Sequence, residues 1–257
     1  MTRPPARRAA IICRAGSLHS LTRRLRDLGW DVVRVETIRI EAAPTGRRPA
    51  WLRRTPPADL WVVTSRAIVD PVLRVHPKWV ADLRRIPETV AIGDDTARAL
   101  ERIGVGPIRV APRGGSSDLL RTMWPVRGRR VLYLRSDRAG PSLARHLRRR
   151  GARVIDRVVY RIREGPPLSP SARQKLAESE TWVISSPSAL EGLRRTLGPA
   201  AFDAKVREAR CFALGERTAR AIREAGARRV MAARTSTQEG LTKLLEKELA
   251  DGSHGRA

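Results

Sequence analysis

One short motif, Gly-x-x-Thr-Ala, occurs twice in this chain and limits its possible folds more than any other feature. It occupies residues 93–97 and 215–219, so the two copies lie 122 positions apart. Each copy follows a short apolar run and opens a helical pattern that ends at a glycine. This order predicts a strand, a tight glycine turn and a helix. Free backbone N–H groups in the first turn of such a helix form a potential anion-binding corner.

The same spacing relates other parts of the chain. Gly29 aligns with Gly151, and Thr64-Ser65 lies one position away from alignment with Ser185-Ser186. Such repetition predicts the duplication of one α/β unit. The alternation of short apolar runs with helical patterns predicts parallel sheets that carry helices on both faces. Ligands bind to such sheets at the carboxyl ends of the strands.

Several helix boundaries follow from local signals. Ser188 with Glu191 and Ser236 with Glu239 match capping boxes, which predict two helix starts. A further helix is expected over 67–75. The last helix is expected to end at Leu249.

The charge leaves two interpretations open. The 257 residues include 52 lysines and arginines against 26 acidic residues, and only five of the 52 are lysine. Genomic composition bias is one explanation, and a polyanionic partner is the other, either nucleic acid or a small molecule with many carboxylates or phosphates. The arginines are spread along the chain and aromatic residues make up only 4%. Both features make nucleic acid an unlikely partner.

Other classes of protein lack support. No apolar run approaches the ~18 residues of a membrane span, and the apolar stretch near the N-terminus is too short for a signal peptide. We therefore expect a cytoplasmic protein without a membrane partner. Cys13 and Cys211 lie in strand-like runs and are expected to be buried free thiols. No phosphate-binding glycine loop, metal-ligand cluster or hydrolase triad is present.

Hydroxyl residues recur at the expected strand ends of both halves. Each one alone is typical of a helix N-cap, but in matched pairs they resemble the walls of a cleft. Tyr160 stands where the first half has Ile38. This tyrosine has two possible roles, packing or donation of a proton to a leaving group. The hydroxyl residues are Thr64, Ser65, Thr96, Ser185, Ser186 and Thr218.

Besides the two glycine corners, six short motifs stand out, namely Cys13-Arg14, Val63–Ser65, Leu132–Arg135, Val158–Arg161, Ser185–Ala189 and Thr237–Leu241. Taken together and in this order, these motifs resemble those of the uroporphyrinogen-III synthase family, and the resemblance covers Ile11 to Leu249. The chain departs from the family in two places. The family usually has proline in the first connector and glycine after the central-strand arginine, where this chain has Val35–Ile38 and Ser136-Asp137.

The resemblance implies an α/β fold of two flavodoxin-like (Rossmann-like) three-layer domains with swapped parts. A two-stranded antiparallel β hinge would join them and place Tyr160 toward the cleft. The expected boundaries are 9–34 plus 164–249 for the first domain, 44–156 for the second, 35–41 and 157–163 for the connecting strands, and disordered tails at 1–8 and 250–257.

The resemblance also implies an enzyme, a hydro-lyase of tetrapyrrole (haem, sirohaem or cobalamin) biosynthesis. It would close hydroxymethylbilane, which carries eight carboxylates, into uroporphyrinogen III with loss of water and inversion of ring D. Tyr160 would be the general acid. The resemblance implies no cofactor and no metal, a monomer, and porphobilinogen deaminase as a transient partner. The expected substrate-binding residues are Arg14, Thr64, Ser65, Thr96, Arg135, Ser136, Ser185, Ser186 and Thr218.

Two alternatives of other kinds remain at the level of sequence. The first is a non-catalytic regulatory protein of the same fold that binds a tetrapyrrole or another polyanion. The second is an unrelated two-domain enzyme for a phosphorylated metabolite, with the phosphate at one of the glycine corners.

Overall fold

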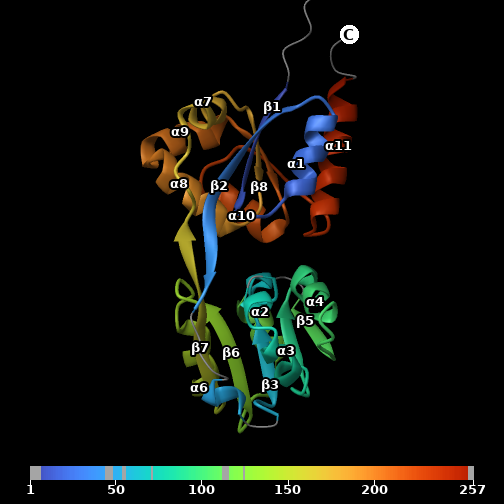
Figure 1. Ribbon diagram of the computed structural model, residues 1–257, viewed down its shortest axis with the longest axis vertical. Coiled ribbons are helices and arrows are strands. Elements are labelled where there is room, and N and C mark those ends of the chain that lie inside the picture. Colours follow the sequence, from blue (N-terminus) through green and yellow to red (C-terminus); the bar gives the residue numbers. More distant parts are fainter. Residues whose placement is uncertain are drawn as a thin grey trace, which may run out of the picture. The chain divides into compact units, whose positions relative to one another are not determined.

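A computed structural model describes residues 7–43, 49–53, 56–70, 72–111, 116–123 and 125–253 (Figure 1). The chain divides into two compact units, and each is described by itself. Unit 1 consists of Met1–Arg39 and Glu164–Ala257, and unit 2 of Ile40–Arg163. Most of the two expected disordered tails, at 1–6 and 254–257, lies outside the described residues.

Unit 1 contains a parallel sheet with the order β10-β9-β8-β1-β2. Helices α1 and α11 lie side by side on one face of this sheet, and α8, α9 and α10 cover the other (Figure 1). The strands are β1 (Arg8–Arg14), β2 (Asp31–Ala42), β8 (Thr181–Ile184), β9 (Arg210–Ala213) and β10 (Arg229–Ala232). The helices are α1 (His19–Asp27), α7 (Pro170–Ala177), α8 (Pro187–Leu197), α9 (Pro199–Glu208), α10 (Glu216–Glu224) and α11 (Gln238–Ser253).

Successive side chains of each strand point to opposite faces of the sheet, and this explains why unit 1 has an apolar layer on each face. In β1, Ile11 packs with the leucines of α1 and α11, whereas Ala10 and Ile12 pack with α8 and its neighbours. The strands are apolar on both faces, as buried parallel strands must be. Cys13 and Cys211 are free and buried, as expected. Burial raises the pKa of the Cys211 thiol to about 12.

Unit 2 contains a parallel sheet with the order β7-β6-β3-β4-β5. Its apolar layers lie on both faces, one under α5 and α6 and the other under the remaining helices. The strands are β3 (Leu60–Val63), β4 (Thr89–Ile92), β5 (Ile108–Ala111), β6 (Arg130–Ser136) and β7 (Arg153–Glu164). The helices are η1 (Ala50–Leu52), η2 (Arg66–Ile68), α2 (Val72–Val75), α3 (Lys78–Leu83), α4 (Asp94–Glu101), α5 (Ser116–Thr122) and α6 (Ser142–Arg149).

The pairing of β6 with β7 repeats that of β1 with β2 at the spacing of 122 positions. Arg8 opposes Asp31 in unit 1, and Arg130 opposes Arg153 in unit 2. Both pairings shift register at the same place, after Cys13 and after Arg135. The five strands of unit 1 and the five strands of unit 2 therefore share one order and one irregularity.

Three expected helix boundaries are wrong. Ser186, not Ser188, caps α8, because Ser186 is extended and its side chain accepts a hydrogen bond from the Ala189 amide while Pro187 fixes the first turn. Thr237, not Ser236, accepts a hydrogen bond from the Gly240 amide at the start of α11, 3.0 Å away. This helix continues to Ser253 instead of ending at Leu249.

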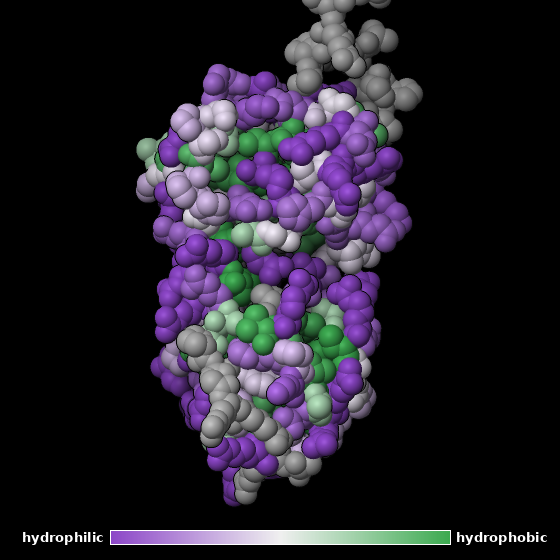
Figure 2. Space-filling view, in the orientation of Figure 1, coloured by the Kyte–Doolittle hydropathy of each residue, from purple (hydrophilic) through white to green (hydrophobic). Residues whose placement is uncertain are grey.

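The helix expected over 67–75 is two short helices, η2 and α2. Pro71 stands between them in the sequence, and a proline cannot continue the hydrogen-bond ladder of a helix. Among the described residues, no helix is long and apolar enough to cross a membrane. Figure 2 shows a face that is mostly hydrophilic, in keeping with a charged fraction of 30%.

Candidate active site

The first glycine corner connects β4 to α4 in unit 2. Gly93 has φ of 75°, a left-handed conformation that favours glycine and agrees with the predicted tight glycine turn. Asp94 and Asp95 occupy the first turn of α4, and Asp95 forms an ion pair of 2.7 Å with Arg66. Burial raises the pKa of Asp95, although Arg66 opposes the effect. This corner therefore already carries negative charge near its amide groups.

The second corner connects β9 to α10 in unit 1 and needs glycine for a different reason. Gly215 is extended, with φ of −176°, and so does not share the left-handed conformation of Gly93. A Cβ atom at this position would lie 2.1 Å from the Ser236 hydroxyl oxygen, and only glycine permits so close an approach. The first turn of α10 contains one acidic residue, Glu216, which pairs with Arg223. This corner is the less acidic of the two.

A buried threonine stands in the first turn of each corner helix. Thr96 and Thr218 are each 5% exposed. In the part of the chain that the structure describes, neither hydroxyl group has a hydrogen-bond partner. Among the described residues, neither oxygen belongs to the fully buried side-chain atoms that lack a partner, so both hydroxyl groups reach solvent and are available to bind a ligand.

The hydroxyl pairs that follow β3 and β8 divide into two kinds. Ser65 and Ser186 are N-caps, and each accepts a hydrogen bond of 3.2 Å, from the amides of Ala67 and Ala189. Thr64 and Ser185 are half-buried, and no described residue bonds to their side chains. The capping serines therefore have a structural role, whereas Thr64 and Ser185 have hydroxyls available to a ligand.

The two expected arginines differ in their surroundings. Arg14 is half-buried at the carboxyl end of β1. The guanidinium of Arg135 forms hydrogen bonds of 2.6 and 3.3 Å to both carboxylate oxygens of Asp156. Its Nη1 also donates to the carbonyl oxygen of Ala139, 2.6 Å away. Arg135 is thus held inside unit 2, and its neighbour Ser136 is buried.

Tyr160 lies on β7 opposite Ser136, next to the carboxyl end of β6. It is 4% exposed and belongs to the apolar cluster that contains Leu132 and Leu134. Packing, the first of its two expected roles, is therefore confirmed. Proton donation remains a prediction.

In each unit the expected residues gather at one edge of the sheet. Unit 1 brings Arg14, Ser185, Ser186 and Thr218 to the carboxyl ends of β1, β8 and β9. The Ser185 amide donates a hydrogen bond of 3.0 Å to the Ile12 carbonyl and so ties the turn after β8 to β1. The junction between β1 and β8 is where the strand order reverses, the usual ligand position in such sheets. Unit 2 gathers Thr64, Ser65, Thr96, Arg135, Ser136 and Tyr160 at the equivalent edge.

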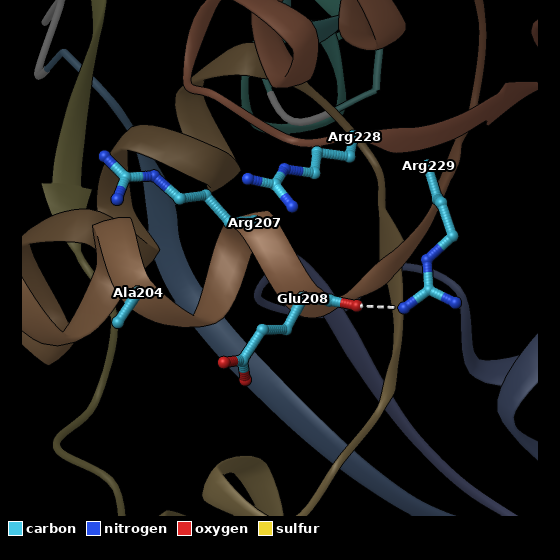
Figure 3. Close-up of a pocket in the computed structure, with 5 residues that line it drawn as sticks. All are labelled: Ala204, Arg207, Glu208, Arg228 and Arg229. Carbon is cyan, nitrogen blue, oxygen red and sulfur yellow. Dashed lines mark hydrogen bonds between the residues drawn. The ribbon is translucent and has the colours of Figure 1, made fainter.

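Figure 3 shows a pocket of unit 1 that the sequence does not predict. Ala204, Arg207 and Glu208 of α9 line it together with Arg228 and Arg229. These residues lie at the amino ends of β9 and β10, whereas the candidate residues follow the carboxyl ends of the strands. The pocket is therefore not part of the candidate site.

Comparison with known families decides the assignment. The family model described as uroporphyrinogen-III synthase HemD matches residues 19–243. The chain belongs to the uroporphyrinogen-III synthase family. The match spans both glycine corners and every expected site residue except Arg14. The family resemblance found in the sequence is thereby confirmed.

Solved uroporphyrinogen-III synthases have the same fold, and the expected mixed α/β class is confirmed. A mutant enzyme from Thermus thermophilus is 20% identical with a TM-score of 0.69, over 96% of this chain and 100% of that chain. The Helicobacter pylori enzyme is 19% identical with a TM-score of 0.59, over 94% of this chain and 99% of that chain. At these identities the likeness shows the fold alone. A comparison with curated proteins found no match.

Proposed function

We propose that this chain is a hydro-lyase that closes hydroxymethylbilane into uroporphyrinogen III, with loss of water and inversion of ring D. The observation that carries the proposal is the family match over 19–243, which includes both threonine corners. No alternative gains support from the comparisons. The proposal includes a transient encounter with porphobilinogen deaminase, which would supply the linear substrate.

The proposal extends to the architecture. Each unit would be one flavodoxin-like domain, because both have the strand order that is typical of flavodoxin. Both domains would descend from one duplicated unit, which the repeated register of β1–β2 and β6–β7 supports. The strands 35–41 and 157–163 would form the hinge. In support, the Ala43 amide donates to the Val159 carbonyl in unit 2, and the Gly165 amide donates to the Thr37 carbonyl in unit 1.

The substrate would be bound through its carboxylates. The proposal assigns one carboxylate-binding corner to each unit, at Thr96 and at Thr218. In each corner a carboxylate would accept hydrogen bonds from the threonine hydroxyl and from amide groups in the first helical turn. Thr64 and Ser185 would add neutral donors, and Arg14 would add positive charge. The corner at Thr218 would contribute more binding energy because fewer acidic side chains oppose a carboxylate there.

Tyr160 would assist the departure of the leaving group. The phenolic proton would pass to the hydroxyl group on ring A, and the C–O bond would break with release of water. The resulting azafulvene cation on ring A would be attacked by ring D through its substituted carbon to give a spiro intermediate. The bond between that carbon and the methylene of ring C would then break, and the methylene would bond to the free α-carbon of ring D, which leaves ring D inverted. The proton lost from this α-carbon would return to the phenolate of Tyr160. Positioning of the two ends would suppress the spontaneous closure to the unrearranged isomer.

Exchanging a corner threonine for valine tests the binding part of the proposal. Thr96→Val and Thr218→Val should each raise KM by about tenfold or more, because one hydrogen bond to a charged carboxylate is lost. The free energy of unfolding should change by less than about 0.5 kcal/mol, since neither hydroxyl has an internal partner to lose. The measurements are KM in an assay coupled to porphobilinogen deaminase and unfolding in urea.

Thr22→Val is the matched control for stability. Thr22 is also a buried helical threonine, but its hydroxyl donates to the Leu18 carbonyl and accepts from Arg34. This variant should lose about 1–2 kcal/mol of unfolding free energy. Corner variants that lose as much stability as Thr22→Val, with KM unchanged, would show that Thr96 and Thr218 are structural.

A further inference from the structure

In each unit, an arginine side chain donates a hydrogen bond to the backbone of one strand–helix loop. These loops connect β1 to α1 in unit 1 and β6 to α6 in unit 2. Arg34 donates a hydrogen bond of 2.8 Å to the carbonyl of Ser17 in the first loop. Arg135 donates one of 2.6 Å to the carbonyl of Ala139 in the second. Ser17 and Ala139 lie 122 positions apart, so the two guanidinium groups bind the same carbonyl of the repeat.

The guanidinium groups reach this carbonyl from different strands. Arg34 is on β2, and its equivalent in unit 2 is Asp156 on β7. Arg135 is on β6, and its equivalent in unit 1 is Cys13 on β1, whose sulfur accepts a hydrogen bond of 3.8 Å from Arg34. The carboxylate partner also moves, from Glu36 in unit 1 to Asp156 in unit 2. Both units therefore have the same contact between a guanidinium group and the loop carbonyl, although the arginine and its carboxylate partner occupy different positions in the two units.

Burial and bonding leave these guanidinium groups little capacity for a substrate. The side chains of Arg34 and Arg135 are 16% and 15% exposed, and that of Asp156 is 11% exposed. All three nitrogens of Arg135 donate within unit 2. In unit 1, Arg34 also donates to Thr22 and to Glu36. Although burial alone would raise the pKa of Glu36, the hydrogen bonds from Arg34 and the Gly16 amide lower it below its ordinary value.

The loops themselves need such support. In unit 1 the loop contains Leu18 with φ of 58°, a left-handed conformation that is costly for leucine. In unit 2 the Asp137 amide donates a hydrogen bond of 3.1 Å to the carbonyl of Tyr160. The equivalent bond in unit 1 runs from the Ala15 amide to the Ile38 carbonyl and measures 2.8 Å. The Ile162 amide returns a bond of 3.0 Å to the Asp137 carboxylate. The loop that Arg135 holds is therefore bonded directly to the backbone of the candidate acid.

We infer that Arg34 and Arg135 are equivalent positioning residues that fix the first strand–helix loop of each unit. The inference reverses the expectation that Arg135 binds substrate, and it assigns a role to Arg34, Asp156 and Glu36 that the sequence does not suggest. In unit 2, Arg135 acts on catalysis through the loop and the Tyr160 backbone. That last step rests on the proposed function, whereas the fixing of the loops does not.

Hydrogen exchange on the free protein tests the fixing of the loops without any substrate. Arg135→Gln should speed amide exchange in residues 137–140 by about tenfold or more, because a charge-assisted hydrogen bond to the loop is lost. Residues 15–18 should stay unchanged. Arg34→Gln should give the reverse pattern, so each variant serves as the control for the other. If Arg135→Gln is too unstable because Asp156 loses its partner, the double variant R135Q/D156N removes the buried charge and should show the same faster exchange.

A transplant of the unit 1 arrangement separates positioning from substrate binding. The triple variant R135C/D156R/V158E places the arginine and its carboxylate at the positions that Arg34 and Glu36 hold in unit 1. It should restore slow exchange in residues 137–140. It should also recover the kcat that Arg135→Gln lowers by roughly 10–100-fold through misplacement of Tyr160, with KM near that of the unaltered protein. Unchanged exchange in Arg135→Gln, or a transplant that restores slow exchange without restoring kcat and KM, would overturn the inference.

Discussion

Replacing Tyr160 with phenylalanine should lower kcat by about 10²–10⁴-fold without abolishing the reaction, because the phenolic proton no longer assists the departure of the hydroxyl group. The products should also shift toward the type I isomer, since the slowed enzyme competes less well with spontaneous closure. Binding should persist, because the corners at Thr96 and Thr218 are intact. The measurement is kcat and the isomer ratio in the assay coupled to porphobilinogen deaminase.

Tyr133→Phe is the matched control for this prediction. Tyr133 is the only other tyrosine of the chain. It is as deeply buried as Tyr160 but belongs to the apolar cluster under α5 and α6, on the opposite face of the same sheet. Its variant should keep kcat within about twofold, because it loses one ordinary hydroxyl away from the candidate edge. Equal losses in both variants, or full kcat in Tyr160→Phe, would contradict an acid role for Tyr160.

Gly165→Ala should produce the largest loss of stability. A Cβ atom at Gly165 would lie 1.6 Å from the backbone carbonyl oxygen of Glu36, so one of the two segments has to move. Because Val35 and Thr37, on either side of Glu36, are buried, we expect a loss above about 3 kcal/mol in the free energy of unfolding. For a chain of this length that corresponds to a fall in Tm of roughly 6–12 °C. Differential scanning calorimetry measures it.

Gly140→Ala provides the comparison. A Cβ atom at Gly140 meets no atom within 4 Å, and this glycine does not have a positive φ. Its Tm should therefore stay within roughly 2 °C of the unaltered protein. If Gly165→Ala were as stable as Gly140→Ala, the close approach of residue 165 to Glu36 would be wrong.

The sequence predicts the strands and the two corners well because their signals are local or repeated. Apolar runs bounded by turn residues mark β1, β3, β8 and β9, and the spacing of 122 positions pairs the two halves without any knowledge of contacts. Helices α7 and α9 are missed because each buries very little, Leu176 in one and Phe202 with Val206 in the other. With so few buried residues, neither helix has a clear apolar period in its sequence.

The site is predicted less completely than the fold. The hydroxyl residues are recognisable because they follow the expected strand ends. The sequence does not show which of their side chains accept a hydrogen bond as a helix N-cap, as those of Ser65 and Ser186 do. The family resemblance implies that Arg135 binds substrate, and the sequence alone does not show that its partner is Asp156, which lies 21 positions away on another strand. The spacing of 122 positions was a usable signal, since it aligns Asp156 with Arg34 and reveals an exchange of charge between two equivalent positions. The structure adds the hydrogen bonds of Arg34 and Arg135, which show that both arginines bind the equivalent loop carbonyl.

The isomer ratio of the product tests the central claim most directly. Purified protein would be mixed with porphobilinogen and a porphobilinogen deaminase, and the oxidised porphyrins would be separated by isomer. The account predicts mainly type III porphyrin with the protein present and type I in the control without it. Type I alone in both samples would contradict the claim and would favour a non-catalytic tetrapyrrole-binding member of the same family.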